Sequence, residues 1–194
     1  MNIEYIKNHY YFETLTEDHD LSKFSCDSED LNDFLKNDAL NQQKVKLNLT
    51  KLCICDGEIV GFVSILSDTI PLKNIRDEET RFNIKPHFTN VSKNKLLPAI
   101  KIGRFAIDNK YSGNGLGSHI LRNVINNIRY ISKNYVGLRF VIVEGYAKAY
   151  SFYVIHNNFK NLKKDDEVII NKLEKIIERN PTQTFYLYLD LLKS

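Results

Sequence analysis

The residues best suited to chemistry lie between Pro98 and Gly117, where an apolar stretch leads into a glycine-rich turn and then into an amphipathic pattern. Residues 98–108 read Pro-Ala-Ile-Lys-Ile-Gly-Arg-Phe-Ala-Ile-Asp, and residues 112–118 read Ser-Gly-Asn-Gly-Leu-Gly-Ser. Small residues let a backbone approach an anion closely, and a helix start presents N–H groups at the positive end of the helix dipole. The pattern predicts a phosphate-binding turn between a strand and a helix.

The apolar stretch before the turn changes phase along its length. Ile100 and Ile102 share one face of a two-residue repeat, whereas Phe105 and Ile107 fall on the other parity. We place the change at Gly103-Arg104, because a glycine-assisted β-bulge adds one residue and swaps the face that points inward. Such a bulge leaves backbone groups available to a ligand. The alternative is a strand buried on both faces, for which parity carries little meaning.

The rest of the chain predicts the elements that must position this segment. Asp56-Gly57 indicates a type I′ hairpin, apolar residues recur every four positions after Gly117, and residues 165–179 place acids first and bases last, as a helix dipole favours. In chain order we expect strand 11–15, a helix from 27 or 28 to 39, strands 51–55 and 58–66, a mainly irregular stretch 68–97 with a short helix, strand 98–108, a helix after 117, strand 138–144, a short helix 147–156, an amphipathic helix 165–179 and strand 185–191. This order predicts a mixed α/β layer fold.

The composition is that of a globular protein with one domain. The chain has 194 residues, 43% hydrophobic and 26% charged, with a net charge of +3 that permits an anionic partner without requiring one. No apolar run reaches the ~20 residues of a membrane span, and the N-terminus lacks the pattern of a secretory signal. The three cysteines are Cys26, Cys53 and Cys55. Without clustered histidines they favour packed core thiols over a metal site, and we expect a cytoplasmic protein.

These residues together resemble the GNAT superfamily of acetyl-CoA-dependent N-acetyltransferases. The main motif of that family is Gln/Arg-x-x-Gly-x-Gly/Ala at a helix start, and here Gly115 and Gly117 supply both glycines while Ser112 replaces the Gln/Arg. The second motif, a short helix ending in Phe-Tyr that closes on Gly-Phe, is matched by residues 149–153 and by Asn158-Phe159. Asn tolerates the left-handed conformation of the replaced glycine.

The resemblance implies α/β (α+β) architecture of the GNAT type. That fold has a mixed, mostly antiparallel central sheet with a bulged, splayed central strand and flanking helices. We expect one such domain over residues 1–194, with an extra helix near 165–179 before the last strand.

A narrower resemblance points to the TacT-like group, toxins that acetylate the amino group of aminoacyl-tRNA. It is carried by Phe24-Ser25-Cys26, by residues 31–35 with Ala39, and by residues 97–108 leading into the glycine turn. The compact toxins lack the 165–179 helix, so the acceptor is less well indicated than the chemistry. This group implies acetyl-CoA as co-substrate, aminoacyl-tRNA as acceptor and a small antitoxin protein as partner. A homodimer is compatible with the sequence.

The resemblance also assigns roles to individual residues. Tyr153 occupies the position of the general acid, whereas by residue type alone it is one of 11 tyrosines and a core or interface aromatic. Glu144 ends a strand and is the candidate base, with a solvated glutamate as the alternative. Arg104 and Lys101 are weak candidates for binding substrate or RNA, and an ion pair is the alternative for Arg104. The expected acetyl-CoA-binding residues are Phe105, Ala106, Ile107, Ser112, Gly113, Asn114, Gly115, Leu116, Gly117 and Ser118. No metal is expected.

Three functions follow from these observations. The first is acetyl transfer to aminoacyl-tRNA. The lack of an obvious general base favours this acceptor, because an α-amine has a pKa near 7.7–8.0 and is partly neutral in the cell. The second is acetyl transfer to a small-molecule amine or to a peptide or protein N-terminus. The third is an acyl-CoA-binding module without catalysis.

Overall fold

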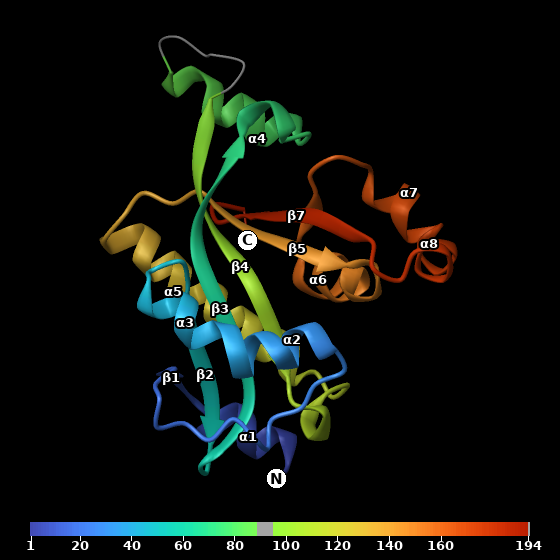
Figure 1. The fold of residues 1–194 in the computed structure, drawn as a ribbon. Coiled ribbons are helices and arrows are strands. Elements are labelled where there is room, and N and C mark those ends of the chain that lie inside the picture. Colours follow the sequence, from blue (N-terminus) through green and yellow to red (C-terminus); the bar gives the residue numbers. More distant parts are fainter. Residues whose placement is uncertain (89–94, 194) are drawn as a thin grey trace. The chain divides into compact units, whose positions relative to one another are not determined.

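The computed structural model describes residues 1–88 and 95–193, which fold as two compact units (Figure 1). Unit 1 comprises residues 1–66 and 102–124, and unit 2 comprises residues 67–101 and those from 125 onward. Seven strands pair in the order β1-β2-β3-β4-β5-β7-β6. The pairings β1–β2, β2–β3, β5–β7 and β6–β7 are antiparallel. The sheet is therefore mixed α/β in class and mostly antiparallel, as predicted.

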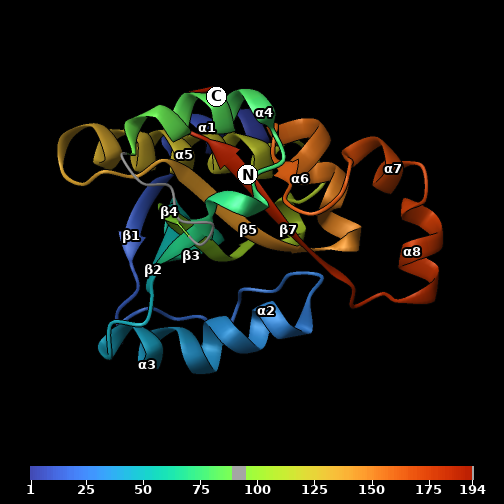
Figure 2. The same ribbon diagram turned by 90° about the horizontal axis from the view of Figure 1, so that it is seen from above.

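Unit 1 is built on the strands β1 to β4. Its elements are α1 (Ile3–His9), β1 (Tyr11–Thr14), α2 (Glu29–Asp33), a π-helical segment (Phe34–Asp38), α3 (Ala39–Lys44), β2 (Leu49–Cys55), the first part of β3 (Glu58–Pro71), the second part of β4 (Leu96–Ile107), a 3₁₀ turn (Asn109–Tyr111) and the start of α5 (Leu116–Asn134). Figure 2 shows α2 and α3 on one side of these strands and α5 on the other. The strands therefore have both faces covered.

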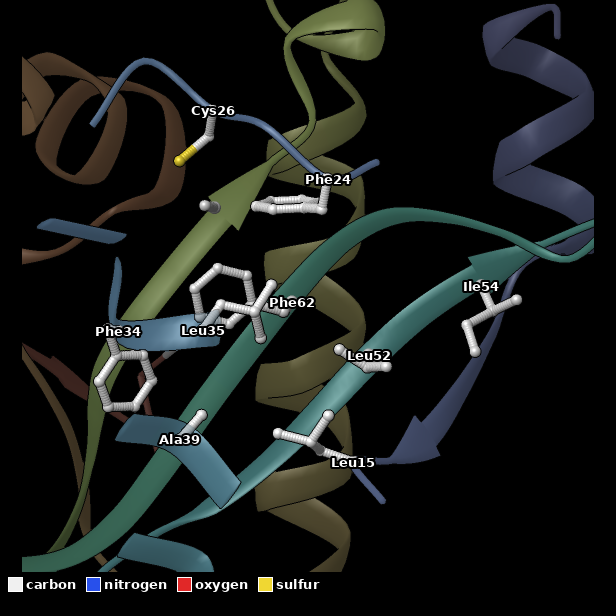
Figure 3. Packing of buried hydrophobic residues seen from close by; sticks show 10 residues of the cluster. Leu15, Phe24, Cys26, Phe34, Leu35, Ala39, Leu52, Ile54 and Phe62 are labelled. Carbon is white, nitrogen blue, oxygen red and sulfur yellow. The ribbon is translucent and has the colours of Figure 1, made fainter. Parts of the chain in front are cut away.

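The core of unit 1 packs the α2–α3 segment onto β2 and β3 (Figure 3). Phe62 lies at its centre, with Phe24 edge-on at 5.6 Å and Phe34 stacked at 6.2 Å between ring centroids. The π-helical segment gives Phe34 and its neighbour Leu35 buried positions in succession. The cluster comprises Leu15, Phe24, Cys26, Phe34, Leu35, Ala39, Leu52, Ile54, Phe62 and Ala106.

The β2–β3 hairpin confirms the turn predicted from sequence. Asp56 and Gly57 both have positive φ, 48° and 77°, as a type I′ turn requires. The register then shifts, because Cys53 pairs with Gly61 and Ile54 with Ile59, so β3 carries an extra residue. This bulge on β3 was not predicted.

Unit 2 contains the C-terminal strands and most of the shorter helices. Its elements are the end of β3, a 3₁₀ turn (Leu72–Asn74), α4 (Glu78–Ile84), a second 3₁₀ turn (Lys85–His87), the start of β4, the rest of α5, β5 (Phe140–Tyr146), a third 3₁₀ turn (Ala147–Ala149), α6 (Tyr150–Asn157), β6 (Lys160–Asn161), α7 (Asp166–Ile170), α8 (Leu173–Arg179) and β7 (Thr184–Asp190). β5 pairs with β7 along its whole length. Residues 140–143 are all buried, which confirms a strand covered on both faces.

Three expectations need correction. The stretch 68–97 is less irregular than expected, since it holds the end of β3, α4 and two 3₁₀ turns within its described residues. The helix over 165–179 is two helices, because Lys172 N–H donates to the Ile169 carbonyl at 3.0 Å, a tight turn that ends α7 with Ile169 buried. The helix α1 and the two-residue strand β6 were not predicted.

The phase change in β4 lies earlier than predicted. The buried side chains are Leu97 and Ala99, then Ile102 and Ala106, so burial changes parity at residues 100–101 and the placement at Gly103-Arg104 was wrong. Gly103 has a different role. A Cβ there would lie 2.9 Å from Leu66 Cδ2, so glycine makes room for a side chain of the neighbouring strand β3.

Candidate functional site

The buried carboxylate of Asp108 fixes the entry to the glycine-rich turn. It is 3% exposed and accepts hydrogen bonds from the Lys110 N–H at 2.9 Å and the Ser25 N–H at 3.1 Å. These bonds hold the 3₁₀ turn Asn109–Tyr111 at the end of β4. The Asp108 carboxylate thus accepts hydrogen bonds from two backbone N–H groups that would otherwise be unpaired.

The turn itself has the geometry of an anion site. Gly113 and Gly115 have φ values of 76° and 78°, and a Cβ at either position would meet no atom within 4 Å. The first backbone bond of α5 runs from His119 N–H to the Gly115 carbonyl at 3.2 Å, so the N–H groups of Leu116 and Gly117 have no acceptor within the helix. The turn is exposed and α5 runs for 19 residues behind it. A turn of this kind can accept an anion on its free N–H groups, and binding of a pyrophosphate by residues 112–118 stays a prediction.

The end of β4 lies against β3 in unit 1. A Cβ on Gly61 would be 2.8 Å from the Ala106 carbonyl oxygen, so that oxygen faces β3, and the Asp108 N–H donates to the Val60 carbonyl at 3.0 Å. Glycine at position 61 is what permits this close approach. Binding of a pantetheine arm by Phe105, Ala106 and Ile107 stays a prediction.

Tyr153 lies on α6 with its ring almost completely buried, at 8% exposure. Its ring contacts Phe152 and Phe159 edge-on, at 5.0 and 5.5 Å between centroids. Within the described part of the chain its hydroxyl has no hydrogen-bond partner, and burial raises the pKa of Tyr153 above its usual value. The phenol therefore stays protonated at neutral pH and holds a proton that no neighbouring group takes up.

Two backbone features place the Tyr153 ring. Asn158 ends α6 with φ 59°, which confirms the left-handed residue expected there. The Phe159 N–H then donates a hydrogen bond to the Tyr153 carbonyl at 3.0 Å. On β5, a Cβ at Gly145 would lie 3.1 Å from Tyr153 Cε2. The missing side chain at Gly145 therefore lets the ring lie directly on the strand.

Glu144 is surrounded by donors and is poorly suited to act as a base. Its carboxylate accepts from Lys101 Nζ and from Thr184 Oγ1, both at 3.1 Å, and from the Tyr186 hydroxyl. Burial raises the pKa of Glu144, but the hydrogen bonds from Lys101, Tyr186 and Thr184 outweigh burial and lower the pKa overall. A carboxylate held in this way keeps its lone pairs occupied and has little affinity for a proton.

The two candidate cations are both engaged. Lys101 pairs with Glu144 and lies 5.4 Å from the Tyr186 ring centroid. Arg104 in unit 1 lies 3.8 Å from the Asp30 carboxylate and 5.1 Å from the Phe34 ring centroid. The ion-pair alternative for Arg104 is therefore the observed one, while binding of substrate or RNA by either residue stays a prediction.

Gly145 and Tyr186 were not among the predicted site residues. Gly145 directly follows Glu144, and a glycine inside an apolar strand signals a close approach, so the signal was present. Tyr186 is one of several aromatic residues on the last strand, and only its register with Glu144 on β5 marks it. Among the described residues, no helix is long and apolar enough to cross a membrane, and no group of three or more metal-ligating side chains occurs.

The strand order, the helix α5 behind the glycine turn and the Phe-Tyr helix α6 define the class: the chain has the GNAT fold. No protein-family model matches it. Over 142 residues it is 29% identical to the tRNA-acetylating toxin of Mycobacterium tuberculosis, covering 73% of this chain and 78% of the relative.

Solved structures of toxins share the fold. AtaT in complex with acetyl-methionyl-tRNAfMet matches with a TM-score of 0.69 and 20% identity, covering 91% of this chain and 93% of AtaT. A tyrosine-to-phenylalanine variant of KacT matches at 0.72 and 17% identity over 95% and 96% of the two chains. AtaTR bound with acetyl-CoA matches at 0.66 and 21% identity over 96% of each.

Proposed function

We propose that this protein transfers the acetyl group of acetyl-CoA to the α-amino group of an aminoacyl-tRNA, and that it acts as a toxin in the cytoplasm. The observation that carries the proposal is the exposed turn at residues 112–118, where two glycines with positive φ open onto the start of α5. The M. tuberculosis relative, named for acetylating tRNA, supports the acceptor. A small antitoxin is the partner that the AtaT–AtaR assembly suggests.

In the proposed reaction the turn holds the anionic end of the co-substrate. The N–H groups of Leu116 and Gly117 donate to the pyrophosphate, while Gly113 and Gly115 keep side chains out of its way. Acetyl-CoA supplies an activated thioester. The α-amine attacks the thioester carbonyl, the C–N bond forms, the C–S bond breaks, and the amine passes its proton to solvent.

Tyr153 is the proposed acid for the departing thiolate. Its raised pKa keeps the phenol protonated over the whole physiological range, so the proton is present whenever the thiolate leaves. General acid catalysis of this kind typically contributes about 10²–10⁴ in rate.

No base is needed from Glu144 in this scheme. An α-amine with a pKa near 7.7–8.0 is substantially neutral at pH 7.5, whereas a lysine or polyamine amine near 10.4 is not. The lowered pKa of Glu144 therefore favours an α-amine acceptor over the alternative of a strongly basic amine. Peptide N-termini share this property and remain the second candidate.

The test is acetyl transfer from radiolabelled acetyl-CoA to charged tRNA, uncharged tRNA, polyamines and peptides in parallel. The proposal expects label on charged tRNA alone, and a fall of about 10²–10⁴ in kcat for Tyr153→Phe. Label on peptides or polyamines in place of charged tRNA would establish the second candidate. Binding of acetyl-CoA with no transfer to any amine would establish a module without catalysis.

A further inference from the structure

A row of side chains crosses the sheet of unit 2 from one strand to the next. It starts with Lys101 on β4, continues with Glu144 on β5 and Tyr186 on β7, and ends with Lys163 just beyond β6. Glu144 and Tyr186 are register partners, and the Leu162 N–H donates to the Tyr186 carbonyl at 3.0 Å. Figure 1 shows β5 and β7, in orange and red, running side by side.

The row lies where the cover over this face of the sheet ends. Two residues earlier on β5, Ile142 pairs with Tyr188, and both are buried in a core that includes Ile84 of α4. Side chains alternate along a strand, so Glu144 and Tyr186 point to the same face as that buried pair. Tyr186 is nevertheless 40% exposed. Its ring is an aromatic surface at the open end of an otherwise covered face.

The Tyr186 ring is held in a fixed place. Its backbone pairs with β5 on one side and with Leu162 on the other, and its hydroxyl donates to Glu144. The ammonium groups of Lys101 and Lys163 lie 5.4 and 5.5 Å from the ring centroid. An exposed ring that is already ordered loses little entropy when a planar ligand stacks on it.

The charges around the ring are unequally compensated. Lys101 is neutralised by Glu144, and Asp68 is a further carboxylate close enough to act on Tyr186. By contrast, Lys163, Lys164 and Arg76 form no ion pair within the described part of the chain. Arg76 Nη1 donates to the Lys163 carbonyl at 3.1 Å, which brings its guanidinium to the same end of the row. That end therefore suits an anion.

We propose that Tyr186 stacks a nucleobase of the single-stranded 3′ end of the acceptor tRNA, while Lys163 and Arg76 contact the adjoining phosphates. Exposed aromatic side chains on a sheet, flanked by cations, are a general means of binding single-stranded RNA, because every base has a face to stack and every linkage a charge. The assignment rests on the proposed function, which makes that 3′ end the part of the acceptor nearest the reacting amine.

The test uses a short single-stranded RNA ending in CCA, with 2-aminopurine in place of the terminal adenine. Stacking quenches 2-aminopurine fluorescence, so the intact protein is expected to quench it on binding. Tyr186→Ala should abolish the quenching and weaken binding roughly five- to 150-fold, whereas Tyr186→Phe keeps the ring and should keep the quenching. Lys163→Ala should weaken binding without removing the quenching, and should reduce the salt slope by roughly 0.7.

Matched controls come from the same unit. Tyr135 is 74% exposed and its ring contacts that of Tyr130, and Lys175 is exposed on α8. Neither residue belongs to the row, so Tyr135→Ala and Lys175→Ala should change neither quenching nor affinity. Quenching that survives in Tyr186→Ala, or is lost equally with Tyr135→Ala, overturns the inference.

The same variants are assayed for the KM of charged tRNA in acetyl transfer. A raised KM for charged tRNA in Tyr186→Ala supports the stacking of a tRNA base on Tyr186. An unchanged KM in an active enzyme overturns the stacking proposal and leaves the proposed function standing. If quenching depends on Tyr186 but the protein acetylates no charged tRNA, the stacking proposal stands and the proposed function fails.

Discussion

Adding one methyl group at Gly145 tests whether Tyr153 acts in catalysis. A Cβ at this position would lie 3.1 Å from Cε2 and 3.2 Å from Cδ2 of the Tyr153 ring. Carbon atoms pack best at about 3.5–4.0 Å, so in Gly145→Ala the ring must retreat by about half an ångström. The φ of Gly145 is not in the positive range, so alanine fits the backbone and the effect acts through the ring.

The size of the effect follows from that displacement. A misplacement of about 1 Å at a reacting group can cost about 10²-fold in rate, so half that distance should lower kcat about tenfold. The crowding should also cost about 1 kcal/mol of folding stability, which corresponds to a Tm lower by about 2–4 °C for a chain of this size. The KM for acetyl-CoA should stay the same, because the glycine turn is untouched.

The assay is a double-mutant cycle on kcat with radiolabelled acetyl-CoA and charged tRNA. Tyr153→Phe removes the hydroxyl and keeps the ring, so adding Gly145→Ala to it should lower kcat no further. Gly137→Ala is the matched control, since a Cβ at Gly137 would meet nothing within 4 Å and should change neither rate nor Tm.

Two results would refute the reasoning. If Gly145→Ala lowers the Tm as expected but leaves kcat unchanged, the position of the Tyr153 ring does not matter to the reaction. If the tenfold loss persists in the Tyr153→Phe background, the effect does not pass through the hydroxyl, and Tyr153 is a core aromatic.

Three further predictions concern the turn, the carboxylate beside Lys101, and an ion-pair cluster in unit 2. Gly115→Ala should raise the KM for acetyl-CoA about tenfold in steady-state assays, because alanine strains a φ of 78°; Gly57→Ala, with φ 77° in the hairpin, should cost similar stability and leave this KM unchanged. Glu144→Gln should lower kcat less than tenfold and leave the pH profile of kcat/KM unchanged. If Glu144 were a general base, the substitution would abolish the decrease of kcat/KM at low pH. Asp77 has a pKa lowered chiefly by its hydrogen bond from Lys193, so its contribution to stability is present above pH ~4 and is lost as the pH falls; in urea unfolding, Asp77→Asn should be less stable than the native chain at pH 7, and the difference should shrink below pH 4.

Local elements were readable from sequence because their causes are local. Asp56-Gly57 specifies its turn through the conformations that these two residues tolerate, and Asn158 does the same at the end of α6. The helix α5 shows its apolar stripe every four residues, and the buried strand β5 shows a continuous apolar run. The glycine turn belongs to the same group, since Gly113 and Gly115 adopt positive φ, which glycine tolerates without strain.

Other features depend on partners that are distant in the chain. The break between α7 and α8 follows the burial of Ile169, and the phase of β4 depends on what covers each face. Glu144 was the candidate base because it ends the strand that follows the glycine turn and its helix, and a solvated glutamate was the alternative. Its lowered pKa comes from Lys101, which lies 43 residues away in sequence, and from donors on the last strand.

The sequence by itself determined the conformation of the turn and the class of fold, because both rest on residue types at short, fixed spacing. Only the tertiary structure decided the surroundings of the candidate site residues. It buried Tyr153 against the bare backbone of Gly145, engaged Glu144 in three hydrogen bonds, and left the ring of Tyr186 exposed beside two lysines. Burial and charge pairing are properties of neighbours in space, and these neighbours come from strands that pair across long stretches of chain.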